Sequence, residues 1–285
     1  MSHPIHKYSA LARPVEPQYP TNLAVIILLP IIAIGLFAWL AMNGSGMGEA
    51  GKSGLFGAGA AFLAWALGRE MDPDHNATAF IAMALTVLLA GLGYGFDLLT
   101  LGAVLFAVRL VNRTVGPPAR IGDVITLVLL NLGAVFAEGA WWMPFISVIA
   151  LAIDEVFERS NLPQRLAIPA LLIMGILPFF AGDGVDFSAM DTLVRGWIVT
   201  VVVIALMVAG TIYNTEEVIA PMDVLGAPCN CRRVQAGMAL ILLAAICSLL
   251  GGQESLAANL GILAVLAASL AGRNVEFGKD DEAAA

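Results

Sequence analysis

Long apolar blocks separated by short polar turns dominate the pattern of hydrophobic and polar positions along this chain. Most blocks are apolar on all sides, whereas a helix at the surface of a soluble protein carries polar residues on its outer face. The pattern therefore predicts helices that are surrounded by lipid or by other helices. The ten expected segments are 23–42, 54–70, 77–96, 98–112, 122–137, 141–157, 165–180, 192–212, 233–250 and 256–272.

Three of the polar turns share one spacing, in which an arginine precedes a proline by four residues. These turns cover residues 69–73, 113–117 and 159–163, so the arginines are 44 and then 46 residues apart. Proline ends the incoming helix, and the arginine faces the negative end of that helix dipole. A fixed period of this size is typical of a repeated helical hairpin. The expected hairpins cover about 54–96, 98–138 and 141–181.

Composition agrees with a membrane protein, because 59% of the 285 residues are hydrophobic and only 13% are charged. We therefore predict an all-α, polytopic membrane bundle of about ten transmembrane helices, including the tandem hairpins. The formal net charge of −8 argues against a nucleic-acid partner, since phosphate backbones select basic surfaces. Three cysteines do not form a disulfide framework, and two of them, Cys229 and Cys231, stand too close together to pair.

The basic residues predict the orientation of the bundle. If the N-terminus lies in the cytoplasm, twelve of the fourteen lysines and arginines fall on the cytoplasmic side, and only Lys52 and Arg195 fall outside. The outer turns are short or acidic, as at residues 183–186. We expect an inner-membrane protein with both termini in the cytoplasm. One transmembrane domain over 23–273 would separate the tails at 1–22 and 274–285.

Charged residues of the inner turns are the candidates for binding chemistry. Arginine forks bind phosphate or a lipid headgroup well, and the candidates are Arg69, Arg109, Arg113 and Arg159. Carboxylates converging from the first and third turns could instead hold Mg²⁺, and these candidates are Asp72, Asp74, Asp154 and Glu158. The residues that differ between the turns are acidic in the first and third and basic in the second.

No acidic, basic or histidine residue falls near the centre of a segment, which disfavours an ion-coupled pump. Asn131 and Asn259 are expected to form hydrogen bonds between helices, and runs of small residues are expected to let helices pack closely. We predict a non-enzymatic protein that transports an uncharged or lipid-like solute or scaffolds a membrane complex, with lipid and other membrane proteins as partners. The alternative is a Mg²⁺-dependent membrane enzyme of the transferase type, acting on a phosphate-bearing lipid at the cytoplasmic face.

Overall fold

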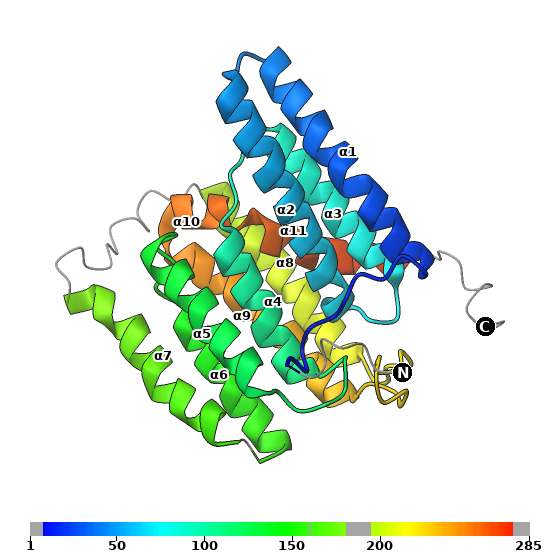
Figure 1. Ribbon diagram of the computed structural model, residues 1–285, viewed down its shortest axis with the longest axis vertical. Coiled ribbons are helices and arrows are strands. Elements are labelled where there is room, and N and C mark those ends of the chain that lie inside the picture. Colours follow the sequence, from blue (N-terminus) through cyan, green and yellow to red (C-terminus); the bar gives the residue numbers. More distant parts are fainter. Residues whose placement is uncertain (1–7, 160, 181–194, 276–285) are drawn as a thin grey trace.

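The computed structural model describes residues 8–159, 161–180 and 195–275 of the chain. The acidic outer turn at 183–186 and most of the predicted C-terminal tail lie outside these ranges. The described residues form helices joined by turns and loops, with no β-strand among them, so the all-α prediction is confirmed (Figure 1). The helices are α1 Pro20–Met42, α2 Met47–Met71, α3 Asn76–Gly91, α4 Leu98–Asn112, α5 Ile121–Phe136, α6 Met143–Phe157, α7 Leu162–Phe180, α8 Arg195–Asn214, α9 Cys231–Leu250, α10 Gly252–Ala258 and α11 Leu260–Gly272.

Each of the ten expected segments overlaps a helix, although three of them differ from the prediction. The third helix ends at Gly91 rather than near residue 96. The second helix begins at Met47 rather than near residue 54, because its first turns carry glycine and charged residues that are not apolar. The tenth segment is not one helix: α10 and α11 meet at an angle of 61°. Asn259 stands at this break, and neither proline nor a polar run in the sequence marks it.

Among the residues that the structure describes, four helices, α1, α7, α8 and α9, are long and apolar enough to cross a membrane, and α10 with α11 would make a fifth, broken span. The helices α3 to α6 contain 15 or 16 residues each. At 1.5 Å per residue they reach about 24 Å, which is less than the roughly 30 Å of the hydrocarbon layer. Helix length and composition thus support four or five spans, and the prediction of ten is not confirmed.

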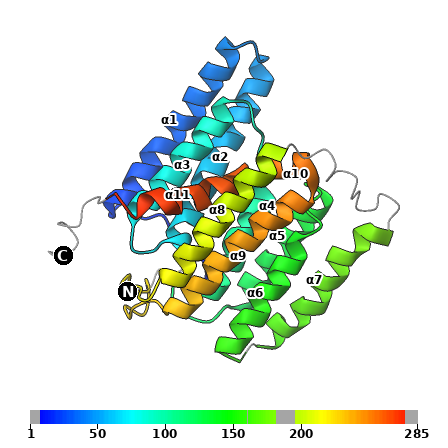
Figure 2. The same ribbon diagram turned by 180° about the vertical axis from the view of Figure 1, so that it is seen from behind.

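Helix α4 lies at the centre of the molecule. It packs against α2, α5, α6 and α9, and most of its side chains are buried. Helices α1, α2 and α3 form a group on one side of it, and α5, α6 and α7 form a group on the other (Figure 1). Seen from behind, α8 and α9 run side by side, and α11 crosses in front of α2 and α3 (Figure 2).

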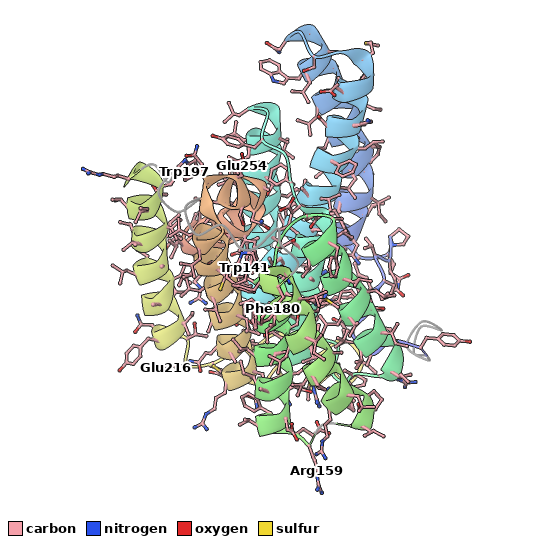
Figure 3. All side chains as sticks on the ribbon, turned by 90° about the vertical axis from the view of Figure 1, so that its left-hand side faces the viewer. Trp141, Arg159, Phe180, Trp197, Glu216 and Glu254 are labelled. Carbon is pink, nitrogen blue, oxygen red and sulfur yellow. The ribbon has the colours of Figure 1, made fainter. Side chains whose placement is uncertain are left out.

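Apart from α10 and α11, the helices share a rough common direction, so the molecule has two ends. Arg159 and Glu216 lie at one end, and Trp197 and Glu254 lie toward the other (Figure 3). We call the first the charged end, because it also carries the turns after α2, α4 and α6 and the loop between α8 and α9. The contacts described below tie these turns and this loop to one another.

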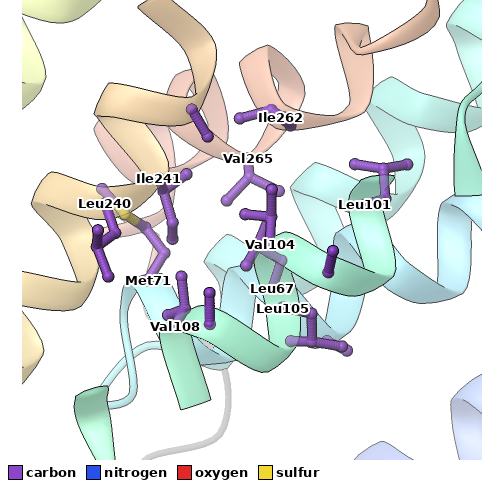
Figure 4. Packing of buried hydrophobic residues seen from close by; sticks show 14 of the residues in the cluster. Leu67, Met71, Leu101, Val104, Leu105, Val108, Leu240, Ile241, Ile262 and Val265 are labelled. Atoms are coloured by element: carbon purple, nitrogen blue, oxygen red, sulfur yellow. The ribbon is translucent and has the colours of Figure 1, made fainter. Parts of the chain in front are cut away.

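Apolar side chains of α2, α4, α9 and α11 meet in the centre of the core, where Val104 and Val108 of α4 face Ile241 and Val265 (Figure 4). Small residues bring neighbouring helices close, as the sequence predicts. A β-carbon on Gly54 of α2 would lie only 2.7 Å from the backbone oxygen of Ala33 in α1. In a lipid environment, which is as apolar as the core, such close contact would contribute mainly through dispersion and packing.

Candidate functional site

A cluster of three charged side chains joins α4, α6 and α9 at the charged end. Arg113 donates from Nε and Nη2 to the two carboxylate oxygens of Asp154, at 3.0 Å each. Arg233, in the first turn of α9, donates from Nη1 to Asp154 Oδ1 at 2.7 Å. The side chains of Asp154, Arg113 and Arg233 are 1%, 8% and 9% exposed. Two buried guanidinium groups therefore share one buried carboxylate in a place that water hardly reaches.

The local backbone and further partners hold this cluster in place. Arg113 directly follows α4 and has a left-handed conformation with a φ of 51°, which costs a residue with a side chain on the order of 1 kcal/mol. Its side chain also binds Glu158, and Gln164 donates to Asp154 at 3.1 Å. Arg233 lies over the ring of Phe157, 4.7 Å from its centroid. These contacts offset the strain at Arg113.

A second buried carboxylate, Glu70 at the end of α2, joins α2 to α4 and to the N-terminal segment. Its Oε1 accepts from Arg109 Nε at 3.0 Å, and its Oε2 accepts from the hydroxyl of Thr114 at 2.8 Å. Arg13 lies 3.7 Å from Glu70 and also pairs with Asp223 of the α8–α9 loop at 2.6 Å. The N-terminal segment and this loop therefore close over the ends of the helices.

Two further acidic side chains of the charged end, those of Asp72 and Asp74, bind the backbone and side chains of the same end. Asp72 Oδ1 lies 2.9 Å from His75 Nδ1, Asp72 Oδ2 accepts from the hydroxyl of Thr78 at 3.0 Å, and Arg273 lies 3.5 Å away. Asp74 accepts from the backbone amides of residues 219 and 220. Both side chains thus tie the turn after α2 to other parts of the chain.

The four carboxylates that the sequence offers for Mg²⁺ do not form one site. Asp154 and Glu158 share Arg113, whereas Asp72 and Asp74 bind the separate partners described above. Within residues 8–159, 161–180 and 195–275, no group of three or more His, Cys, Asp or Glu side chains is arranged to hold a metal ion. The chemistry of this arrangement is ion pairing within the protein.

The four arginines that the sequence offers for phosphate have different surroundings. Arg109 and Arg113 pair with the buried carboxylates, and Arg159 is exposed at the tip of the turn after α6 (Figure 3). Arg69 is partly buried, donates to Asn22 Oδ1 at 3.3 Å and lies 5.3 Å from the centre of the Trp65 ring. The three turns with the same spacing thus place their arginines in three different environments.

Sequence reasoning missed Arg13 and Arg233 as members of this network. Arg13 belongs to the proline-rich segment that the sequence predicts to be the N-terminal tail. The neighbouring Leu11 is nevertheless only 1% exposed. Arg233 stands at the start of an apolar segment, where an arginine is ordinarily explained by the orientation of the protein in the membrane. It pairs with Asp154, 79 residues away in sequence. A buried carboxylate near the end of an apolar segment was the one available signal, because a buried charge requires a partner.

A separate polar contact lies at the opposite end, around the break between α10 and α11. Asn259 donates to Asp97 at 3.2 Å, and Glu138 accepts from the first amides of α4, at Leu99 and Thr100. Burial, and then the nearby charge of Glu138, raise the pKa of Asp97 to about 6. Asp97 therefore holds its proton more readily than an ordinary aspartate does.

The expected hydrogen bond of Asn131 is confirmed: its amide donates to Ser147 at 2.9 Å and joins α5 to α6. Cys229 is 5% exposed in the α8–α9 loop, and burial raises the pKa of its thiol to about 11. A thiol with that pKa is protonated at neutral pH and reacts slowly.

Comparison of the chain with protein-family models, with characterised proteins and with solved structures finds no match.

Proposed function

We propose that this chain is a non-enzymatic, multi-pass protein of the inner membrane that acts as a scaffold in a membrane complex. The observation that carries the proposal is the buried cluster of Asp154 with Arg113 and Arg233. It joins three helices at one end of the bundle. An alternating-access transporter would have to open that end in each cycle, and opening would expose or separate these charges, which is costly for buried ion pairs.

The outer helices suit a protein that is surrounded by lipid and by other membrane proteins. In α1 and in α8, only 11% of the apolar window is buried within the chain. A transmembrane partner could pack on these faces, and lipid would cover them otherwise. The other non-enzymatic role that we consider is transport of an uncharged or lipid-like solute. That role requires the charged end to open.

Ten spans, with both termini in the cytoplasm, complete the proposal. The short helices α3 to α6 would then borrow length from their turns, thin the bilayer locally or lie inside the bundle. The charged end would face the cytoplasm, in accord with the distribution of lysine and arginine. The alternative of a Mg²⁺-dependent enzyme has less support, because its four carboxylates bind partners within the chain.

Spin labels at the charged end test whether this end stays closed. Val156 of α6 and Arg232 of α9 are exposed neighbours of the cluster and would each be replaced by cysteine in a chain without native cysteines. In lipid nanodiscs, we expect one narrow distance distribution between the labels. Asp154→Asn should broaden that distribution. Two well-separated distances in the otherwise unaltered protein would favour the transporter and contradict a static scaffold.

A further inference from the structure

A small pocket lies where the N-terminal segment, α1, α2 and α4 meet. Its volume is about 50 Å³, which is room for a few water molecules or one small ion. The apolar part of its wall comes from Pro14, Val15, Phe62, Ala66 and Leu105. The polar part consists almost entirely of hydrogen-bond donors, and these side chains are Arg13, Asn22, Trp65, Arg69 and Arg109.

Positive charge exceeds negative charge around this pocket. Arg13, Arg69 and Arg109 line it, and two carboxylates, Glu70 and Asp223, pair with two of these arginines. Arg109 binds Glu70, and Arg13 binds Asp223 and approaches Glu70. The excess of one positive charge therefore falls on Arg69.

Arg69 makes few contacts for a partly buried guanidinium group. Its partners are the neutral Asn22 and the face of Trp65, and no carboxylate lies within 4 Å of it in the part of the chain that the structure describes. An arginine has five N–H donors, so most of them have no acceptor among these residues. A charge removed from water without a counter-ion is unfavourable, and an anion in the pocket would remove that cost.

Trp65 supplies a second, independent sign of a missing acceptor. The residue is only 3% exposed, lines the pocket, and its indole Nε1–H has no hydrogen-bond partner among the described residues. Buried indole N–H groups ordinarily have one. A second, smaller pocket of about 20 Å³ also has Arg13 and Arg69 in its wall, so these two arginines face open space on more than one side.

We propose that this pocket binds a phosphate group, as the headgroup of an anionic membrane lipid or as a soluble phosphate. A phosphate accepts hydrogen bonds in several directions, which suits donors that come from the N-terminal segment and three helices. The volume fits the phosphate group alone, and the apolar side chains beside it would contact the adjoining carbon atoms of a lipid. The site involves no chemical reaction and does not depend on the scaffold function.

Thermal unfolding of the full chain in a neutral detergent tests the site. The probes are inorganic phosphate, short-chain phosphatidic acid and, as a zwitterionic comparison, short-chain phosphatidylcholine. Stabilisation by phosphatidic acid alone would assign a lipid headgroup, and stabilisation by inorganic phosphate as well would assign a free phosphate. Both results support a phosphate site. If neither phosphatidic acid nor inorganic phosphate stabilises the protein, the proposal is overturned.

Arg69→Gln should weaken binding of the effective probe at least about tenfold, since it removes charge-assisted hydrogen bonds. Without any ligand, this variant should unfold at or above the wild-type temperature, because the unpaired charge is gone. Arg159→Gln is the matched control: it alters the exposed arginine of the turn after α6 and should bind like the wild type. Equal loss in both variants, or no loss in Arg69→Gln, would overturn the site.

Trp65→Phe provides a test that leaves every charge in place. It removes the indole N–H and keeps an aromatic ring beside Arg69, so it should weaken phosphate binding severalfold. The smaller buried ring also lowers the ligand-free unfolding temperature, so binding is compared as the shift that each probe produces. If Arg69→Gln fails to fold, this variant decides the question. Unchanged affinity in Trp65→Phe would then contradict the proposal.

Discussion

Replacing Asp154 with asparagine should destabilise the protein far more than replacing its neighbour in sequence, Glu155. Asparagine preserves the shape of the side chain but removes the negative charge with which Arg113 and Arg233 both pair. Removal of one partner of a buried ion pair typically costs about 3–5 kcal/mol. Because Glu158 still partners Arg113, we expect a loss near the lower limit, about 3 kcal/mol.

Glu155→Gln is the control because its carboxylate pairs with Arg165 on the surface, where the two side chains are 41% and 44% exposed. Such surface pairs contribute about 0–1 kcal/mol, so this variant should unfold almost like the wild type. The free energy of unfolding can be measured by titration with sodium dodecyl sulfate in mixed micelles. Equal stability of the two variants would refute the argument from burial.

A double variant separates the loss of a charge from the loss of packing. Asp154→Leu combined with Arg233→Met removes both members of the shorter ion pair and leaves Arg113 with Glu158. Replacing a complete buried pair by apolar residues is often neutral or stabilising, so this variant should recover most of the stability that Asp154→Asn loses. A double variant less stable than Asp154→Asn would contradict the electrostatic explanation.

Three further predictions follow from the surroundings of single residues. The raised pKa of Asp97 means that the folded state binds the proton of this side chain more tightly than the unfolded state does. The contribution of neutral Asp97 to stability is therefore present below about pH 4 and is lost as the pH rises through about 6. Asp97→Asn should flatten this part of the stability–pH curve. Gly237→Ala should destabilise the protein by about 1 kcal/mol because its methyl group would overlap the side chain of Asn112, whereas Gly210→Ala, with nothing within 4 Å, should be neutral or stabilising in the same unfolding assay. Cys229 should react with iodoacetamide at neutral pH at least about tenfold more slowly than a free cysteine, and mass spectrometry of the alkylated peptide measures this rate.

The sequence predicts the positions of the helices well because apolar blocks and proline turns are local features. Each expected segment overlaps a helix, and the turns after α2, α4 and α6 stand where the proline spacing places them. The break at Asn259 is different, since it depends on contacts of the folded chain: the Asn259 side chain donates to Asp97, 162 residues away. Local sequence does not contain that information.

The candidate site was harder to predict because partner choice among charges is a long-range property. The common spacing suggests that Arg69, Arg113 and Arg159 have one role, yet the first faces a pocket, the second pairs with Asp154 and the third is exposed. Their surroundings come from helices that are distant in sequence, such as the Arg233 contribution of α9. Charge counts can predict on which side of a membrane such residues lie, but not which of them pair.

Labelling of single cysteines in intact cells tests the central claim, that this is a multi-pass membrane protein whose charged end faces the cytoplasm. Arg159 and Glu254 lie toward opposite ends of the molecule (Figure 3), and α7, α8 and α9, three of the helices long enough to span, stand between them. With a membrane-impermeant maleimide and no other cysteine in the chain, Glu254→Cys should be labelled. Arg159→Cys should be labelled only after the membrane is opened. Equal labelling of both in intact cells, or labelling of Arg159→Cys alone, would contradict the account.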